Sequence, residues 1–486
     1  MSSVTRLATK GVLWVGISQM SVQVFRFVFT MLLARLLVPD DFGIIGMAAI
    51  FIGLVSTVNE LGLSASIVQR KEVHERHLST SFWTSIFVGL VLFVMTLIIS
   101  PYVADFFKTA IVQPILDTLS VTFIIGSFVV VHSAMLTKNL DFKRLAKAEV
   151  FSELVSGSMA VYLAFTGFGV WSLVWRTIIG NLIFVVLLWT INPWRPTMSF
   201  DLKSFNELFG FGANVIGSNF VNYAAKNVDY LVIGKFLGAM SLGYYTLAYQ
   251  MITFPLYRVS VVITRVMFPA FSMVQGENER LGRGYLAVTK YLSLITFPMI
   301  AGIFIVSPEF IPIVMGEKWV QVILPLQILC LAGALQSVGV ACGPVLLSKG
   351  RADLSFKWSI IKLFALIAAI LVGIKYGIIG VAVTVTILSF LFFWIMQKIV
   401  NDLIGMDFRN YLKALYPATL NSVIMIISVY LFKEIAFRFL DLPSIAVLAC
   451  SVILGTFMYL AVLRLLYNDI ILELRSLMRQ GMEKME

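Results

Sequence analysis

The side chains best suited to binding chemistry are cations that lie deep within long apolar stretches of the sequence. Arg26, Arg176, Lys226 and Arg258 each fall near the middle of such a stretch, and Arg265 lies nearer to one end. Arginine binds a phosphate through two parallel hydrogen bonds, and lysine attracts it as a compact charge. The pattern therefore indicates a site for a ligand that carries several negative charges, such as a diphosphate.

Polar residues accompany these cations at the spacing of a helical face. In the first stretch Gln19, Gln23 and Arg26 recur at intervals of four and three residues, which places them on one side of a helix. The deep cations are thus expected to line a common cavity. The polar residues that share a face with a cation are Gln19, Gln23, Asn219, Asn222, Tyr223 and Tyr257.

Glu60 and Asp229 are the carboxylates expected deep within the same stretches. Lys226 and Asp229 stand three residues apart on one helix and could form a buried ion pair. Glu60 could be the counter-ion of Arg26, which we favour, or could couple the protein to an ion gradient by binding a proton or a sodium ion. Even if both acids pair, cations remain in excess, and an unpaired buried charge is costly. A bound anion would compensate for that excess.

The composition identifies the medium that surrounds these residues. Of 486 residues, 59% are hydrophobic and 13% are charged, whereas soluble domains carry about 45–50% apolar and about 25% charged residues. We therefore expect an all-α integral membrane protein with about 14 transmembrane helices of roughly 20 residues each. The 3 cysteines and 3 histidines are too few and too scattered to predict a metal site.

The basic residues outside the apolar stretches are concentrated in alternate loops. Cytoplasmic loops of membrane proteins carry an excess of lysine and arginine, so this distribution places both termini in the cytoplasm. The formal net charge of +11 is then mainly a signal of topology, and we expect no binding of nucleic acid.

The sequence contains an internal repeat, which predicts two six-helix lobes related by a pseudo-twofold axis along the membrane normal. Shifts of 200 to 211 residues superpose Arg26 on Lys226, Gly43 on Gly243, and Lys138 on Lys349. The expected parts are an N-terminal lobe at 1–191, a cytoplasmic linker at 192–207, a C-terminal lobe at 208–400, two additional transmembrane helices at 401–466 and a cytoplasmic amphipathic tail at 467–486.

Three short segments resemble a known family. They are LARLLVPDDFG at 33–43, ELGL at 60–63 and MFPAFS at 267–272. They are similar to bacterial polysaccharide exporters and lipid-linked oligosaccharide flippases of the multidrug/oligosaccharidyl-lipid/polysaccharide superfamily, and the sequence is nearest to the colanic acid and teichuronic acid exporter group. The resemblance implies a multi-pass protein of the bacterial cytoplasmic (inner) membrane that works by alternating access.

The resemblance also implies a cargo and a role for the cations. The cargo would be an oligosaccharide repeat unit linked to undecaprenyl diphosphate, moved from the inner to the outer leaflet, with the deep cations around its diphosphate. Its sugars would contact the asparagine, glutamine and tyrosine side chains by hydrogen bonds. Membrane lipids, and a polysaccharide polymerase or other assembly proteins, are the expected partners. No cofactor is expected, and coupling to Na⁺ or H⁺ stays open.

Two other function classes would require different features of the sequence. A multidrug or metabolite extruder of the same superfamily, coupled to a cation gradient, would need a neutral or negative cavity. A membrane-embedded enzyme would need an acid/base constellation or a sizeable loop, and the sequence has no HExxH, no Walker loop and no GxSxG with partners. We therefore expect a transporter and no enzymatic activity.

Overall fold

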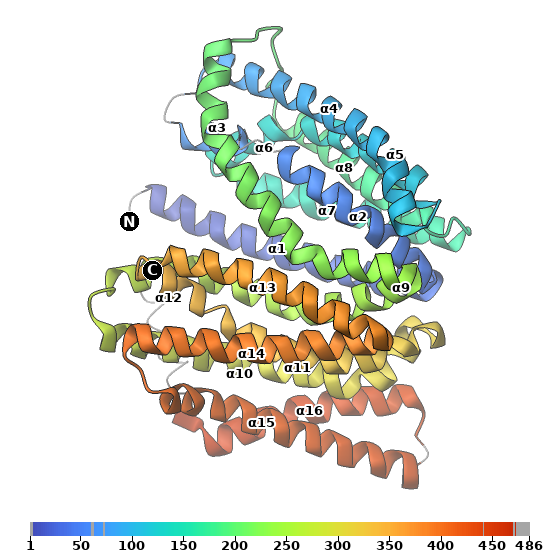
Figure 1. Cartoon of the computed structure of the whole chain (residues 1–486), viewed down its shortest axis with the longest axis vertical. Helices are drawn as coiled ribbons and strands as arrows, with labels where there is room; N and C mark the ends of the chain where they lie inside the picture. Colours follow the sequence, from blue (N-terminus) through green and yellow to red (C-terminus); the bar gives the residue numbers. More distant parts are fainter. Residues whose placement is uncertain (1–2, 60–62, 71–72, 441, 470–471, 473–486) are drawn as a thin grey trace. The chain divides into compact units, whose positions relative to one another are not determined.

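The computed structural model describes residues 3–59, 63–70, 73–440, 442–469 and 472. Side chains in these ranges are described except for 3–13, 15, 17, 58, 59, 63, 65, 202–222, 225, 255–266 and 440. The described residues form helices joined by short turns, and none of them forms a strand (Figure 1). The predicted all-α class is confirmed.

The chain divides into two compact units, and the first comprises Met1–Thr246. Its helices are α1 (Ser3–Leu36), α2 (Pro39–Asn59), α3 (Leu63–Gln69), α4 (Glu75–Phe107), α5 (Val112–Ser127), α6 (Val130–Lys138), α7 (Phe142–Phe165), α8 (Trp171–Ile191) and the first part of α9 (Leu202–Met273). Within this unit α1 packs against α7, α7 against α8, and α4 against α5. Three helices, α1, α7 and α8, thus form one continuous layer of contacts.

The second unit comprises Leu247–Glu486. Its remaining helices are α10 (Asn278–Phe310), α11 (Ile323–Gly339), α12 (Cys342–Ser348), α13 (Ala352–Gly373), α14 (Gly377–Ile404), α15 (Phe408–Ile435) and α16 (Ser444–Leu466), with short 3₁₀ or π turns at Ile311–Met315, Glu317–Val322, Ile374–Tyr376 and Ala436–Leu440. Within it α10 packs against α15 and α11, α13 against α14, and α15 against α16. The helices predicted after residue 400 therefore pack on α10.

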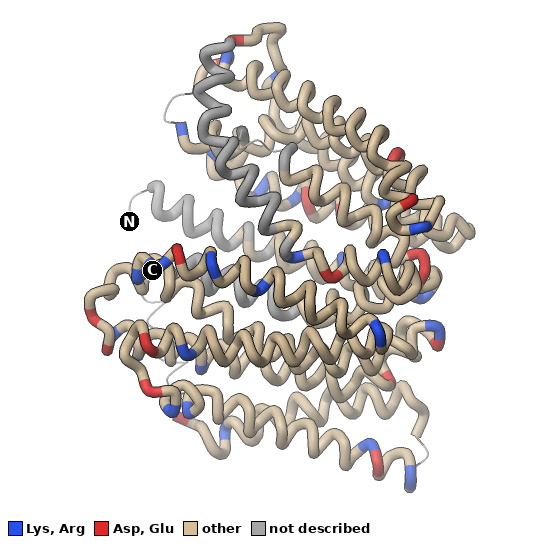
Figure 2. Tube along the Cα trace, in the orientation of Figure 1, with Lys and Arg blue, Asp and Glu red and all other residues tan. Residues whose placement is uncertain are grey.

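The helices have the length and composition of membrane spans. Among the described residues, ten helical segments are long and apolar enough to cross a membrane, or eleven if the bent pair α5 and α6 is one more span. Figure 2 shows that charged residues lie mostly near helix ends, with long uncharged stretches between them. This arrangement keeps most charge out of the hydrocarbon layer, where it would be costly.

A close helix crossing joins α2 to the first part of α9. The backbone of α9 is broken at Gly238, which has φ 81° and ψ 179°, so the chain turns there as it does between α1 and α2. A Cβ atom on Gly43 would lie 1.7 Å from the carbonyl oxygen of Ala239, and one on Gly243 would lie 1.9 Å from that of Pro39. The 200-residue shift superposes Gly43 on Gly243 and Pro39 on Ala239. Each glycine therefore packs against the repeat equivalent of the residue that the other glycine contacts. Only glycine allows so close an approach.

Hydrogen bonds hold the segment after α8 against α4, within the first unit. The Trp194 indole donates to the Glu75 carboxylate at 3.0 Å, and the Trp83 indole donates to the carbonyl of Thr197 at 2.8 Å. The backbone N–H of Asp201 donates to the Thr80 hydroxyl at 3.1 Å. Part of the predicted linker, 192–201, is therefore an ordered segment that packs against the start of α4.

Two lysines superposed by the repeat make the same kind of contact. The Lys138 ammonium, at the end of α6, donates to the carbonyl oxygens of Ile67, in the last turn of α3, and of Arg70, just after it. The Lys349 ammonium, after α12, donates to the carbonyl oxygen of Gln275 at 2.5 Å. Each lysine therefore satisfies backbone carbonyls at or just beyond the C-terminal end of another helix, where carbonyls have no helical partner.

Replacing Lys138 with methionine is expected to lower the free energy of unfolding by about 1–2 kcal/mol, because partly buried carbonyls lose a charged donor. The measurement is thermal unfolding of the detergent-solubilised protein. The control is Arg144→Met, since Arg144 is exposed and pairs with Asp141 at 3.4 Å on the surface. Equal destabilisation by the two substitutions would contradict the structural role of Lys138.

Candidate functional site

Two of the predicted cations meet at one carboxylate in the layer formed by α1, α7 and α8. The Arg26 guanidinium on α1 donates through Nη2 to Oε2 of Glu153 at 3.1 Å. The Arg176 guanidinium on α8 donates through Nη2 to Oε1 of the same residue at 2.6 Å. Each carboxylate oxygen thus accepts from a different arginine, and the cluster of Arg26, Glu153 and Arg176 keeps one surplus positive charge.

The two arginines differ in their freedom. The Arg176 side chain is 15% exposed and that of Glu153 is 12% exposed, whereas the Arg26 side chain is 56% exposed. The Arg176 guanidinium also lies 6.0 Å from the ring centroid of Phe29, a distance at which a cation is attracted to the ring face. Arg176 is therefore held by its surroundings, and Arg26 extends from the cluster with most of its donors uncovered.

The sequence analysis missed Glu153, and its count of deep carboxylates was wrong. The apolar stretch of the sequence that includes Glu153 begins near residue 149, so Glu153 was expected near the end of a span. However, α7 begins at Phe142, because Asp141 caps it by accepting from the Arg144 N–H at 3.3 Å. Glu153 consequently lies in the middle of a 24-residue helix. Among the described residues Glu153 is the counter-ion of Arg26, and Glu60 lies outside them.

A second carboxylate lies one turn away on the same face of α7. Glu149 accepts a hydrogen bond from the Ser18 hydroxyl of α1 at 2.9 Å. Glu149 and Glu153 stand four residues apart, so both face α1, and this spacing was the sequence signal that could have identified the cluster.

The predicted pair of Lys226 with Asp229 is not formed among the described residues. The Asp229 carboxylate is buried and accepts instead from the Tyr245 hydroxyl at 2.9 Å, across the turn at Gly238. Its other oxygen, Oδ1, has no hydrogen-bond partner in the part of the chain that the structure describes. Lys226 is exposed. The Tyr223 hydroxyl donates to the carbonyl of Ala49 at 3.2 Å and so holds α9 against α2.

The remaining predicted residues divide into two groups. Gln19 and Gln23 are half-buried on α1, the helix that carries Arg26. The structure thus brings Arg26 and Arg176 together, and it provides no contact that joins Lys226 to them. The predicted residues whose side chains lie outside the described part are Glu60, Asn219, Asn222, Tyr257, Arg258 and Arg265.

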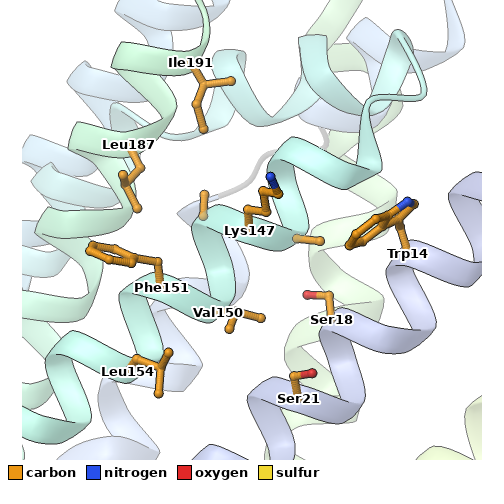
Figure 3. Close-up of a pocket in the computed structure, with 11 residues that line it drawn as sticks. Trp14, Ser18, Ser21, Lys147, Val150, Phe151, Leu154, Leu187 and Ile191 are labelled. Carbon is orange, nitrogen blue, oxygen red and sulfur yellow. The ribbon is translucent and has the colours of Figure 1, made fainter.

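A groove borders the same layer of helices, and the sequence analysis did not predict it. It has a volume of about 550 Å³ and is lined mainly by apolar side chains of α1, α7 and α8, among them Phe151, Leu154 and Leu187 (Figure 3). Lys147 is the cation in its lining. Such a surface suits a hydrocarbon chain and offers little to a sugar.

The described residues include no group of three or more histidine, cysteine, aspartate or glutamate side chains that could hold a metal ion. The cluster of Arg26, Glu153 and Arg176 offers charge pairing and hydrogen bonding. A guanidinium with free donors beside a fixed carboxylate–guanidinium pair can bind an anion of the size of a phosphate.

The fold defines the class of protein first. The solved structure of "Lipid II flippase MurJ, inward closed conformation" superposes with a TM-score of 0.76, covering 95% of this chain and 100% of that one at 17% identity. The chain therefore shares the fold of that multi-helix membrane protein.

The family follows from the sequence comparisons. The profile of the family described as "Polysaccharide biosynthesis protein" matches residues 32–324. Teichuronic acid biosynthesis protein TuaB of Bacillus subtilis is 31% identical, with 85% of this chain and 87% of that protein covered. Lipopolysaccharide biosynthesis protein WzxC of Escherichia coli is 30% identical, with 84% and 82% covered. The chain belongs to the polysaccharide biosynthesis protein family, and the predicted resemblance is confirmed.

Proposed function

We propose that this protein is a flippase that moves an oligosaccharide linked to undecaprenyl diphosphate from the inner to the outer leaflet of the bacterial cytoplasmic membrane. Membership of the polysaccharide biosynthesis protein family and the fold shared with a lipid II flippase support this function. The observation that carries it is the cluster of Arg26, Glu153 and Arg176, in which guanidinium groups of α1 and α8 share one carboxylate in the middle of α7. A diphosphate is the natural ligand of such a surplus of charge.

The cargo would move by alternating access between two lobes related by a pseudo-twofold axis, within a total of about 14 spans. Two long helical segments, Lys226–Phe254 and Ala352–Ile404, contain a glycine with positive φ, Gly238 and Gly377 respectively. Each segment is therefore proposed to hold parts of two spans joined by a turn. Gly43 and Gly243 make similar contacts in the fold, and so do Lys138 and Lys349. These similarities support duplicated lobes.

The other predicted residues take their roles from the same proposal. Lys226, Arg258 and Arg265 would add positive charge around the diphosphate, and the polar residues on their faces would bind sugar hydroxyls. Glu60 or Asp229 would couple transport to Na⁺ or H⁺, or would only pair with cations. Both termini would lie in the cytoplasm, and a polysaccharide polymerase or other assembly proteins would act beside the flippase. No enzymatic step is proposed.

The groove bounded by Trp14, Phe151 and Leu187 would hold the first isoprene units of the carrier lipid. Its apolar lining suits a hydrocarbon chain, and Lys147 provides a charge complementary to the diphosphate. The groove shares α1 and α7 with the charged cluster, as expected for a ligand that has an anionic head and a long apolar tail.

A multidrug or metabolite extruder coupled to a cation gradient is the second candidate. The observation in its favour is Asp229, a buried carboxylate whose Oδ1 has no partner among the described residues. Such a group suits a cationic substrate or a coupling ion.

The test is reconstitution into liposomes that contain a fluorescent oligosaccharide linked to undecaprenyl diphosphate. Transfer between leaflets is measured with a quencher that does not cross the membrane, and protein-free liposomes are the control. Faster transfer with protein is expected. Absence of transfer, together with uptake of organic cations by the same vesicles, would favour the extruder.

A further inference from the structure

Glu153 is the one member of the charged cluster whose charge has the same sign as the cargo. We infer that its carboxylate is an internal competitor of the cargo's diphosphate, occupying Arg26 when the site is empty and helping to expel the diphosphate at release. This inference rests on the proposed function and deepens it, because it assigns a release role to a residue that does not bind the cargo.

The competition follows from the chemistry of the two anions. A carboxylate and a phosphate offer the same arrangement of two acceptor oxygens to a guanidinium fork. Arg26 has five N–H donors, and its Nη2 group donates to Oε2 of Glu153 at 3.1 Å. A phosphate that accepts the Nη2–H now bonded to Glu153 must therefore displace Glu153 from Arg26.

The exchange takes place at Arg26 and leaves Arg176 in position. The Arg176–Glu153 contact is the shorter one, at 2.6 Å, and both of its side chains are largely buried. Gly157 opens the space for the Phe29 ring, since a Cβ atom there would lie 2.2 Å from that ring. The Phe29 ring in turn lies beneath Arg176. The Arg176–Glu153 ion pair thus stays in place, and Arg26 is the residue that changes partner.

Each charged group of the cluster has a partner in both states. In the empty site Glu153 pairs with both arginines, and in the loaded site it keeps Arg176 while Arg26 pairs with phosphate. No charge is left buried without a partner in either state, which avoids a large penalty. Because Glu153 occupies Arg26, the apparent affinity for cargo equals the intrinsic affinity multiplied by the fraction of molecules in which Arg26 is free.

The direct test is Glu153→Gln, which keeps the shape of the side chain and its carbonyl acceptor but removes the charge. Binding of undecaprenyl diphosphate to the purified full-length protein is measured in lipid nanodiscs, and flipping is measured in liposomes. The variant is expected to bind about twofold to fivefold more tightly, the size of effect typical of a partly exposed ion pair, and to flip more slowly because release is delayed.

The matched control is Glu149→Gln, one turn earlier on α7, whose carboxylate accepts from Ser18. It is expected to leave both binding and flipping near the wild-type values. Undecaprenyl monophosphate is the second probe, and Glu153→Gln should tighten its binding by a similar factor, since the competition concerns one phosphate at Arg26.

Weaker or unchanged binding by Glu153→Gln would overturn the inference, because Glu153 would then serve only to orient the arginines. If that variant does not fold, Glu153→Asp replaces it. The shorter aspartate keeps the charge beside Arg176 but reaches Arg26 less well, so tighter binding is again expected and weaker binding again counts against the inference. Failure of the proposed function is distinguishable, because the wild-type protein itself would then neither bind nor flip the lipid diphosphate.

Discussion

Replacing Arg26 with alanine is expected to lower the rate of lipid-diphosphate flipping by at least about tenfold. A hydrogen bond to a charged group contributes about 1.5–3 kcal/mol, which corresponds to a factor of ten or more in binding. Arg26 is the exposed member of the cluster, with a side chain that is 56% exposed, so its donors are the ones that a cargo can reach. The measurement is the initial rate of leaflet transfer in liposomes.

Two companion variants separate binding from folding. Arg26→Lys keeps the charge but loses the planar fork, so an intermediate rate is expected. Arg176→Ala leaves the largely buried Glu153 with Arg26 alone and should lower the thermal unfolding temperature more than Arg26→Ala does. Flipping by Arg26→Ala at the wild-type rate would remove Arg26 from the site and, with it, the observation that carries the proposed function.

The membrane class and the depth of the cations were predictable because they depend on local sequence. Long apolar stretches specify spanning helices whatever their neighbours are, and a charge in the middle of one must face protein or water. Arg26 and Arg176 were identified in this way. The family resemblance was predictable for the same reason, since its segments are contiguous in the chain.

The partners of those cations were not predictable from spacing alone. Glu153 was missed because the start of α7 depends on the Asp141 cap, which extends the helix seven residues before the predicted start at 149. The ion pair that Lys226 and Asp229 could form is not observed among the described residues, where the Asp229 carboxylate accepts from Tyr245, beyond the turn at Gly238. Both cases concern contacts between residues that only the folded chain brings together.

Gly43→Ala is expected to be the most destabilising of the small substitutions on α2. Its new Cβ atom would lie 1.7 Å from the carbonyl oxygen of Ala239 and 2.4 Å from the carbonyl carbon. These are backbone atoms, which move only if α2 and α9 move apart. Overpacking of a core costs about 1–3 kcal/mol and occasionally more, and a clash with backbone belongs at the upper end. Thermal unfolding in detergent is the measurement.

The matched control is Gly46→Ala, one turn later on the same helix. Its Cβ atom would meet the Leu242 side chain at 3.5 Å, which is an ordinary contact. A small change in stability of either sign is therefore expected, since alanine also favours the helix. Similar losses of stability from Gly43→Ala and Gly46→Ala would mean that the flexibility of α2, and not its crossing with α9, determines the effect of the substitutions.

The double variant Gly43→Ala with Gly243→Ala tests whether the two glycines serve one crossing. The Gly243 Cβ atom would lie 1.9 Å from the carbonyl oxygen of Pro39 and 3.2 Å from the backbone nitrogen of Gly43. Once Gly43→Ala has separated α2 from α9, part of the space that the new methyl group of Gly243→Ala needs is already open. The loss in the double variant should therefore be smaller than the sum of the two single losses, whereas additive losses would indicate two independent contacts.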